Sequence, residues 1–243
     1  MVCRDMTVTV PPPDTTAAPV SAVEAIRSRR AVRAFLPTPV PDATVEAILD
    51  LSARAPSGSN IQPWGVQVLR GAPLAALTQE LHGRFLAGDL GAEEYAYYPR
   101  QWREPHLSRR RKVGWDLYGA LGIAKGDAER MRQQHARNFL FFDAPVGLVV
   151  TMGRDLERGS WLDCGMFLEN IMIAARAFGL GTCPQAAFNG YGRLMAERLA
   201  LPDTEMVVCC MALGHPDPDA PENTFPTERE PARGFARFVE ALA

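Results

Sequence analysis

Four arginines lie within seven residues near the start of the chain: Arg27, Arg29, Arg30 and Arg33. A phosphate carries nearly two negative charges, and the planar fork of a guanidinium group matches its acceptor oxygens. Each charge-assisted hydrogen bond of this kind contributes about 1.5–3 kcal/mol. The cluster therefore suits a bound phosphate. Taken alone, however, the segment is better explained as a solvated basic end of a helix, which the helix dipole favours.

A loop at 55–63, with the sequence APSGSNIQP, offers a second set of polar groups. Its hydroxyls, its amide and its flexible backbone N–H groups suit the polar edge of a ligand, such as a ribityl chain or a ring carbonyl. Ser, Gly and Asn are also ordinary turn residues, so a plain turn is the alternative.

Small residues dominate the segment 179–187, GLGTCPQAA, and they allow backbone to approach a flat ligand closely. The alternative is a strand of small residues packed beneath a helix. The GLG piece lacks the third glycine and the helix of a dinucleotide-binding fingerprint, which argues against a Rossmann fold. Within the segment, Cys183 is expected to be a buried core thiol rather than a reactive one.

The first arginines are positioned by a helix that is expected to begin at Ser21, because Ser21 and Glu24 form an S-x-x-E capping box. This helix is expected to continue through Arg29 or Arg30. If its last turn persists, Arg29 and Arg33 are four residues apart and point in the same direction.

Apolar periodicity and turn residues predict the remaining elements. The stretch 88–105 is expected to be irregular and aromatic. Charged residues interrupt the longest apolar stretch, 161–178, so it is expected to be buried in a core or a subunit interface rather than in a membrane. Helices are expected at 42–54, 74–86, 106–122, 127–142, 160–178 and 190–200, and strands at 65–70, 145–152 and 206–213. The stretch 180–187 is expected to be a short strand or an extended segment.

Strands and helices are mixed without strict alternation, which favours an α+β fold over a doubly wound sheet. No repeat or long linker divides the chain, so we expect one domain at 21–243, with an aromatic excursion at about 88–122. The proline-rich tail from 214 is expected to run extended, and its Arg229 matters only if the tail folds back to the first arginines. Residues 1–20 are expected to form a flexible arm, either disordered or wrapped on a partner subunit.

The composition limits the possible partners. A hydrophobic fraction of 47%, a charged fraction of 22% and a net charge of −2 are typical of a soluble globular protein and favour neither nucleic acid nor a membrane surface. Five cysteines form no CxxC pair, and none of the four histidines lies at metal-ligand spacing from one. A disulfide framework or a metal site is therefore not expected, and reduced thiols in the cytoplasm are.

The four segments, in this order, resemble the nitroreductase superfamily of FMN enzymes over about Ser21 to Phe238. RSRRAVRAF resembles the family motif R-R-S-x-R-x-F, and APSGSNIQPW resembles A-P-S-x-x-N-x-Q-P-W, the most specific of the set. LDCGMFLENIMIAARAFGLGTCPQ resembles the long interface helix and the GLGT strand, and GHPDP and TER resemble the end of the closing strand and the C-terminal arginine. The segments YYP, RRRKVGWDLYGALGI and NFLFFDAPVGL are similar to the branch that reduces nitrobenzoates.

The resemblance implies an α+β sandwich in which helices flank a central mixed, mainly antiparallel sheet, and an intertwined homodimer with FMN at its interface. By matched motif, Arg29, Arg30, Ala31 and Arg33 hold the phosphate and ribityl end, and Arg229 reaches the same phosphate from the tail. Ala31 stands where the family has serine, so only its backbone N–H donates there.

The resemblance also assigns the ring of the flavin. Either Arg137 or Asn138 is implied at the flavin O2/N3 edge, and a backbone N–H near Ala186 is implied at N5. The ring is lined by Pro184, Gln185, Ala186 and Ala187, and Pro56, Ser57, Gly58 and Asn60 come from the other subunit.

The implied reaction is a two-electron ping-pong cycle in which NADPH or NADH reduces FMN and a nitroaromatic or related electron-poor acceptor then reoxidises it. A cation near O2, Arg137 or Arg33, stabilises the reduced flavin, and no catalytic side chain is expected. The basic run Arg109–Lys112 either favours acidic substrates or a nucleotide phosphate or is a solvated helix face. An aromatic acceptor is expected to stack on Tyr97, Tyr98, Trp102 and Tyr118, although about half of the excursion's large aromatics are expected to be packing residues.

Other functions on the same scaffold stay open at this point. They are a dehalogenase, a quinone or enoate reductase, a flavin-fragmenting enzyme, a biosynthetic oxidase and a flavin-binding protein without turnover.

Overall fold

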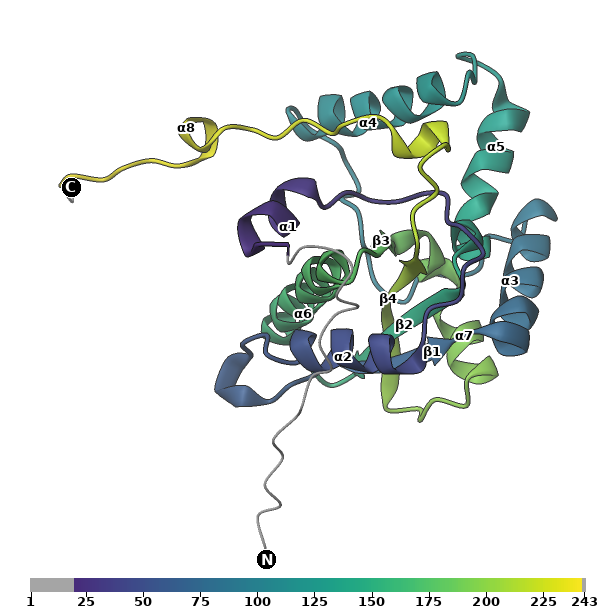
Figure 1. The fold of residues 1–243 in the computed structure, drawn as a ribbon, viewed down its shortest axis with the longest axis horizontal. Helices are drawn as coiled ribbons and strands as arrows, with labels where there is room; N and C mark the ends of the chain where they lie inside the picture. Colours follow the sequence, from purple (N-terminus) through teal and green to yellow (C-terminus); the bar gives the residue numbers. More distant parts are fainter. Residues whose placement is uncertain (1–19, 242–243) are drawn as a thin grey trace, which may run out of the picture.

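The protein is described by a computed structural model that covers residues 20–241, so the predicted arm at 1–20 lies almost wholly outside the described residues. At its centre is a four-stranded sheet in the order β1-β2-β4-β3, with every neighbouring pair antiparallel (Figure 1). Gly181 lies opposite Gly214, and Gln185 lies opposite Cys210. The strands are β1 (Gly65–Leu69), β2 (Val146–Gly153), β3 (Gly181–Gln185) and β4 (Glu205–Gly214).

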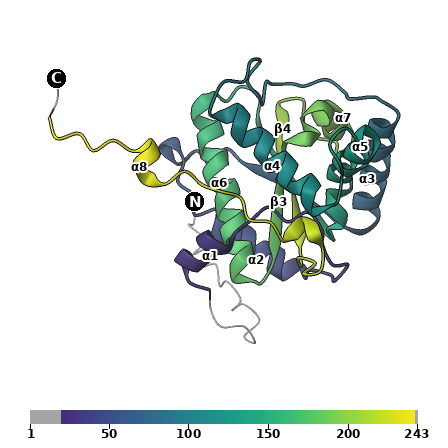
Figure 2. The ribbon, with the colours of Figure 1, turned by 90° about the horizontal axis from the view of Figure 1, so that it is seen from above.

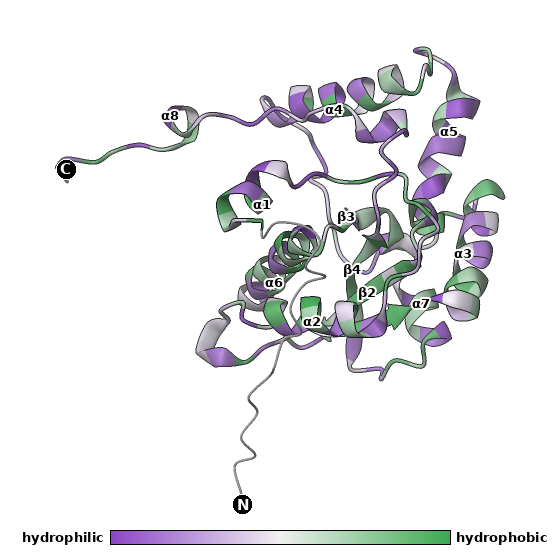
Figure 3. Ribbon diagram, in the orientation of Figure 1, coloured by the Kyte–Doolittle hydropathy of each residue, from purple (hydrophilic) through white to green (hydrophobic). Residues whose placement is uncertain are grey.

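Helices cover both faces of this sheet, because successive side chains of a strand point to opposite faces. Leu148 and Met211 belong to the core on one face, and Val149 and Cys210 belong to the core on the other. Apolar colour is concentrated on the central strands in Figure 3, as expected for a sheet buried on both faces. The first face carries α2 (Asp42–Ser52) and α6 (Arg158–Ala177); the second carries α3 (Gly71–Leu86), η2 (Arg137–Asp143), η3 (Ala186–Tyr191) and α7 (Gly192–Arg198).

The first helix, α1 (Ala22–Ser28), begins as predicted, since the Ser21 hydroxyl accepts a hydrogen bond from the Glu24 N–H at 3.2 Å. It does not continue through Arg29 or Arg30, so that expectation is wrong: Arg29 already has extended backbone. The reason is tertiary pairing. The Val32 N–H donates to the Thr182 carbonyl at 2.9 Å, and a segment in this pairing cannot also make helical hydrogen bonds.

The single helix expected at 127–142 is also wrong. The chain forms α5 (Ala128–Ala136) and then the 3-10 segment η2, within which Phe141 and Phe142 have φ values of 50° and 55°. Both rings are fully buried, with exposures of 0% and 2%. Asp143 follows with a φ of 66°. Burial of the two aromatic side chains outweighs the cost of this left-handed backbone, which is about 1–3 kcal/mol for each residue.

The excursion is irregular at 88–105, as predicted, and then forms α4 (His106–Ala120), none of whose residues is buried. Beyond β4 the tail forms η4 (Pro221–Asn223), passes α4, forms the short α8 (Ala232–Phe235) and extends away from the body (Figures 1 and 2). Among residues 20–241, no helix is long and apolar enough to cross a membrane.

Candidate functional site

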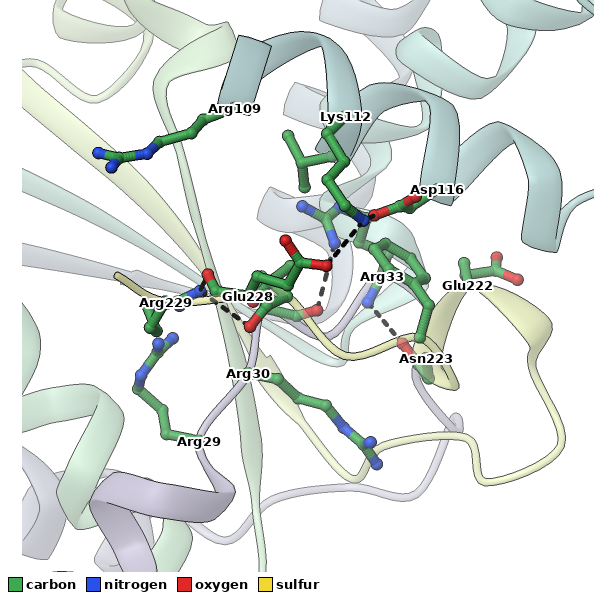
Figure 4. Close-up of a pocket in the computed structure, with 14 residues that line it drawn as sticks. Arg29, Arg30, Arg33, Arg109, Lys112, Asp116, Glu222, Asn223, Glu228 and Arg229 are labelled. Carbon is green, nitrogen blue, oxygen red and sulfur yellow. Dashed lines mark hydrogen bonds and ion pairs between the residues drawn. The ribbon is translucent and has the colours of Figure 1, made fainter. Parts of the chain in front are cut away.

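The arginine segment and the tail meet around a cavity of about 430 Å³, which we call the arginine cavity (Figure 4). The tail therefore does fold back to the first arginines, which was the condition for Arg229 to matter. The cavity is lined by Arg29, Arg30, Ala31 and Arg33, by Arg109, Lys112, Val113 and Asp116 of α4, and by Glu222, Asn223, Phe225, Thr227, Glu228 and Arg229 of the tail.

Asn223 holds the two chain segments together. Its Oδ1 accepts from the Arg33 N–H at 2.8 Å, and its Nδ2 donates to the carbonyls of Ala34 at 2.8 Å and Asp217 at 2.9 Å. The residue is only 4% exposed. Asn223 was not predicted from the sequence, because an asparagine in a proline-rich tail has no local pattern that distinguishes a bridge from a turn.

The cations of this cavity differ in how they are neutralised. Within residues 20–241, Arg30, Arg33 and Arg229 have no carboxylate within 4.0 Å, and Arg29 Nε lies 3.8 Å from the half-exposed Glu169. Arg229 instead donates through Nη1 to the Thr227 hydroxyl at 2.8 Å and the Glu228 carbonyl at 2.9 Å. Like charges at close range repel one another, so a bound anion stabilises this arrangement.

A second cavity, of about 510 Å³, adjoins the end of β3, and we call it the β3 cavity. Arg33 lines both cavities, so the two are neighbours. All four residues predicted to face a flat ring line it, namely Pro184, Gln185, Ala186 and Ala187.

Gln185 gives the β3 cavity an unfilled hydrogen-bonding position. The residue is 2% exposed, and its Nε2 donates to the Asn138 carbonyl at 2.8 Å. Its Oε1 is buried and accepts no hydrogen bond from the described residues. A buried acceptor without a donor costs about 1–3 kcal/mol, so a donor group placed next to this atom would be stabilising.

Of the two candidates for the far edge of a ring, Asn138 lines the β3 cavity and Arg137 does not. Arg137 forms ion pairs with the buried Glu222 and, at 3.0 Å, with Asp143. Arg33 is therefore the arginine that faces this cavity.

The loop predicted to bind a ligand lies apart from both cavities in the single chain. Pro56, Ser57, Gly58 and Asn60 line neither of them, and the Gly58 N–H points to the carboxylate of Asp163 on α6, at 3.2 Å. The loop contains the short 3-10 helix η1 (Gly58–Asn60) and three non-glycine residues with positive φ: Ser59 at 51°, Asn60 at 57° and Gln62 at 48°. Such backbone is costly and tends to occur at functional sites.

The predicted aromatic residues are only partly brought to the β3 cavity. Tyr98 lines it, whereas Tyr97, Trp102 and Tyr118 do not. The ring of Tyr97 lies 4.8 Å from that of Tyr98, and the ring of Trp102 lies 5.4 Å from it. Tyr118 packs on Trp115 of α4 at 5.9 Å. A row of rings thus leads away from the cavity.

Several lining residues were not predicted, and no local signal marks them. The most notable is His135, which packs against Phe85 and Phe139, and burial lowers the pKa of its imidazole. The other unpredicted residues of the β3 cavity are Phe85, Leu90, Gly91, Glu93, Phe139, Asn189, Gly190 and Tyr191.

Cys183 also lines the β3 cavity, and it is buried, with 3% of its surface exposed. Burial raises the pKa of its thiol to about 11, although the nearby Arg33 acts in the opposite direction. The thiol is therefore protonated near neutral pH and unreactive, as the sequence predicted. No cluster of three potential metal ligands occurs among residues 20–241.

Two kinds of comparison relate this geometry to known sequences. The model of the Nitroreductase family matches residues 26–215. The 4-nitrobenzoate reductase of Pseudomonas putida is 41% identical over 214 residues, which is 88% of this chain and 93% of that protein. The nitrobenzene nitroreductase of Ectopseudomonas oleovorans is 40% identical over 215 residues, covering 88% of this chain and 95% of that protein.

Solved structures give the same picture. The FMN- and NADPH-dependent nitroreductase NfnB from Sphigopyxis sp. strain HMH superposes with a TM-score of 0.88 and 36% identity, covering 91% of this chain and 100% of that one. The FMN-dependent nitroreductase NfnB from Mycobacterium smegmatis, solved with NADPH, has a TM-score of 0.85 and 29% identity, covering 90% and 98%.

Proposed function

The chain belongs to the nitroreductase family, and from this premise we propose that it is an FMN-dependent oxidoreductase that uses NADPH or NADH to reduce nitroaromatic or related electron-poor acceptors. The observation that carries the proposal is the pair of adjoining cavities, one cationic and one flat-walled, that share Arg33. Relatives named as reductases of nitrobenzoate and nitrobenzene, and structures named as FMN- and NADPH-dependent, support it.

The residues present fit FMN at both ends. A phosphate of nearly two negative charges complements Arg29, Arg30, Arg33 and Arg229, whose charges are largely uncompensated. A flat ring suits the wall of small residues at 184–187, and a ring N–H suits the orphaned Oε1 of Gln185. When bound, FMN supplies hydride chemistry that accepts two electrons from the nucleotide and passes two to the acceptor.

The protein then contributes position and charge. We assign the phosphate to the four arginines, with Ala31 contributing only backbone, and the far edge of the ring to Asn138. The guanidinium of Arg33 faces the β3 cavity and stabilises negative charge that develops there on two-electron reduction. For a nitro group, the balanced change is R–NO₂ + NAD(P)H + H⁺ → R–NO + NAD(P)⁺ + H₂O, and water can supply the protons.

We propose that a homodimer completes the site. Large apolar side chains are exposed on α6, where Leu162 is 72% exposed, on α1, where Val23 is 64% exposed, and on the tail, where Phe238 is 85% exposed. Exposed apolar surface on three elements indicates a partner. In this arrangement Pro56, Ser57, Gly58 and Asn60 reach the cofactor of the other subunit.

The acceptor is proposed to be a small aromatic molecule that stacks on Tyr98, with Tyr97, Trp102 and Tyr118 extending the aromatic surface. We further propose that the described chain is one domain and that it works in the cytoplasm, since its four described cysteines are free thiols.

The test begins with the visible spectrum of the purified full chain, which should show flavin bands. Anaerobic addition of NADPH or NADH should bleach these bands, and 4-nitrobenzoate should restore them. A colourless protein that takes up no FMN refutes the cofactor assignment. A flavoprotein whose bands neither nucleotide bleaches refutes the proposed reaction.

A further inference from the structure

The basic run of α4 is divided between two environments. Arg110 lies over the ring of Trp102, with its Cζ 5.0 Å from the ring centre. Arg109 and Lys112, three residues apart and therefore on one face of the helix, instead line the arginine cavity. The run is thus more than a uniform solvated helix face.

The tail presents two acids to that face. Glu228 Oε1 lies 3.3 Å from Lys112 Nζ (Figure 4). Glu230 Oε2 lies 2.5 Å from Arg109 Nη2. Arg229 lies between the two acids in the chain and hydrogen-bonds to the Thr227 hydroxyl and the Glu228 carbonyl. It lines the cavity together with Arg29 and Arg30.

We propose that Arg109 and Lys112 are positioning residues for the cofactor phosphate. Their ion pairs with Glu230 and Glu228 set the register of the tail on α4, and that register places Arg229 in the arginine cavity. Because Arg229 lies between the two acids, a displacement of this segment along α4 moves Arg229 from its place in the cavity. The inference rests on the proposed FMN site, and it adds that α4, the helix of the aromatic excursion, helps to assemble that site.

The position of Glu228 indicates that Arg109 and Lys112 hold the tail in place and do not bind the phosphate directly. Its carboxylate lines the same cavity as the arginines, where it repels a phosphate. An acid in a phosphate site weakens phosphate binding, so Glu228 needs a second role to explain its position. Its contact with Lys112, which holds the tail on α4, is that role. The two explanations therefore predict opposite effects when Glu228 is replaced by a cation.

The experiment measures the dissociation constant of FMN by fluorescence quenching with the deflavinated full chain. If the ion pairs hold the tail in place, Glu228→Lys should weaken FMN binding about two- to tenfold. The effect is modest because exposed ion pairs are weak, although the new lysine also repels Lys112. Lys112→Glu should weaken binding similarly, and the double exchange Lys112→Glu/Glu228→Lys should restore it. Glu46→Lys, which makes the same charge change at an exposed position of α2, is the control and should have little effect.

Tighter FMN binding by Glu228→Lys, or a double exchange no better than the single variants, overturns the proposal. Cleavage after Arg229 by an arginine-specific protease in the flavin-free protein gives an independent readout: it should be faster in each single variant and slow again in the double exchange. If the wild-type chain binds no FMN, the proposed function and the role of Arg229 are refuted together. The cleavage rates then separately confirm or refute the ion pairs as the contacts that hold the tail.

Discussion

Replacing Asn223 with alanine should loosen the arginine segment from the tail and weaken both folding and FMN binding. The side chain makes three hydrogen bonds with backbone groups of Arg33, Ala34 and Asp217. The Ala34 carbonyl also accepts from the Asp217 N–H at 3.1 Å, so it stays paired in the variant. The variant loses two hydrogen bonds in full and one in part at a buried position. Its free energy of unfolding should therefore fall by about 2–3 kcal/mol.

The free energy of unfolding from urea titration of the flavin-free protein measures this loss. If FMN must draw the detached segment back, its dissociation constant rises by about thirty- to hundredfold, since each 1.4 kcal/mol is a factor of ten. Asn223→Asp should be at least as harmful, because it places an acceptor opposite two carbonyl oxygens. Thr224→Ala removes a local, exposed hydrogen bond to the Pro221 carbonyl and is the matched control.

A loss of stability below about 0.5 kcal/mol in Asn223→Ala, together with unchanged FMN affinity, would refute the view that this residue joins the two halves of the phosphate site. A loss of stability without a loss of FMN affinity would support the role of Asn223 in joining the two segments. It would refute a role of Asn223 in binding the cofactor.

Four further predictions concern single features of the site. The double variant Arg29→Ala/Arg33→Ala should be purified without flavin bands, and retained FMN would contradict the assignment of the phosphate. Cys183 should resist iodoacetamide at pH 8 in the native protein, because a pKa of about 11 leaves roughly one thiol in a thousand ionised; fast labelling located there by mass spectrometry would contradict its burial. Burial favours neutral His135, so stability should fall as the pH drops below about 6.5, and urea titrations at pH 7.5 and 5.5 should show a smaller fall for His135→Gln. Tyr98→Ala should raise the KM for a nitroaromatic acceptor severalfold without changing FMN affinity, and an unchanged KM would remove Tyr98 from the acceptor site.

The elements of the fold could largely be predicted, because local patterns determine them. The capping box at Ser21 and the apolar strand that becomes β4 are examples. The errors occur where long-range contacts override local preference. Arg29 leaves the helix because the following backbone pairs with Thr182, and the expected helix at 127–142 breaks because two phenylalanines are needed in the core.

The short motifs of the candidate site could be recognised in the sequence, whereas the long-range contacts between them could not. Arg29, Gln185 and Arg229 were identified from short segments, and the structure brings each of them to one of two adjoining cavities. Asn223 and His135 were missed because each acts through partners far away in sequence. The proposed preference for Asn138 over Arg137 likewise depends on a distant contact, the ion pair between Arg137 and the buried Glu222.

The loop with Ser59 and Asn60 connects the single chain to the proposed homodimer. Its left-handed residues are held in part by the Gly58 N–H, which donates to the carboxylate of the buried Asp163. The residue before Asp163, Leu162, is 72% exposed, and Met166, one turn later, is 39% exposed. The same turn of α6 therefore fixes the loop and presents the apolar surface proposed to meet the partner. If that surface forms the interface, association of two chains carries each loop toward the other subunit without a change of loop shape, and the strained backbone is formed before the partner binds.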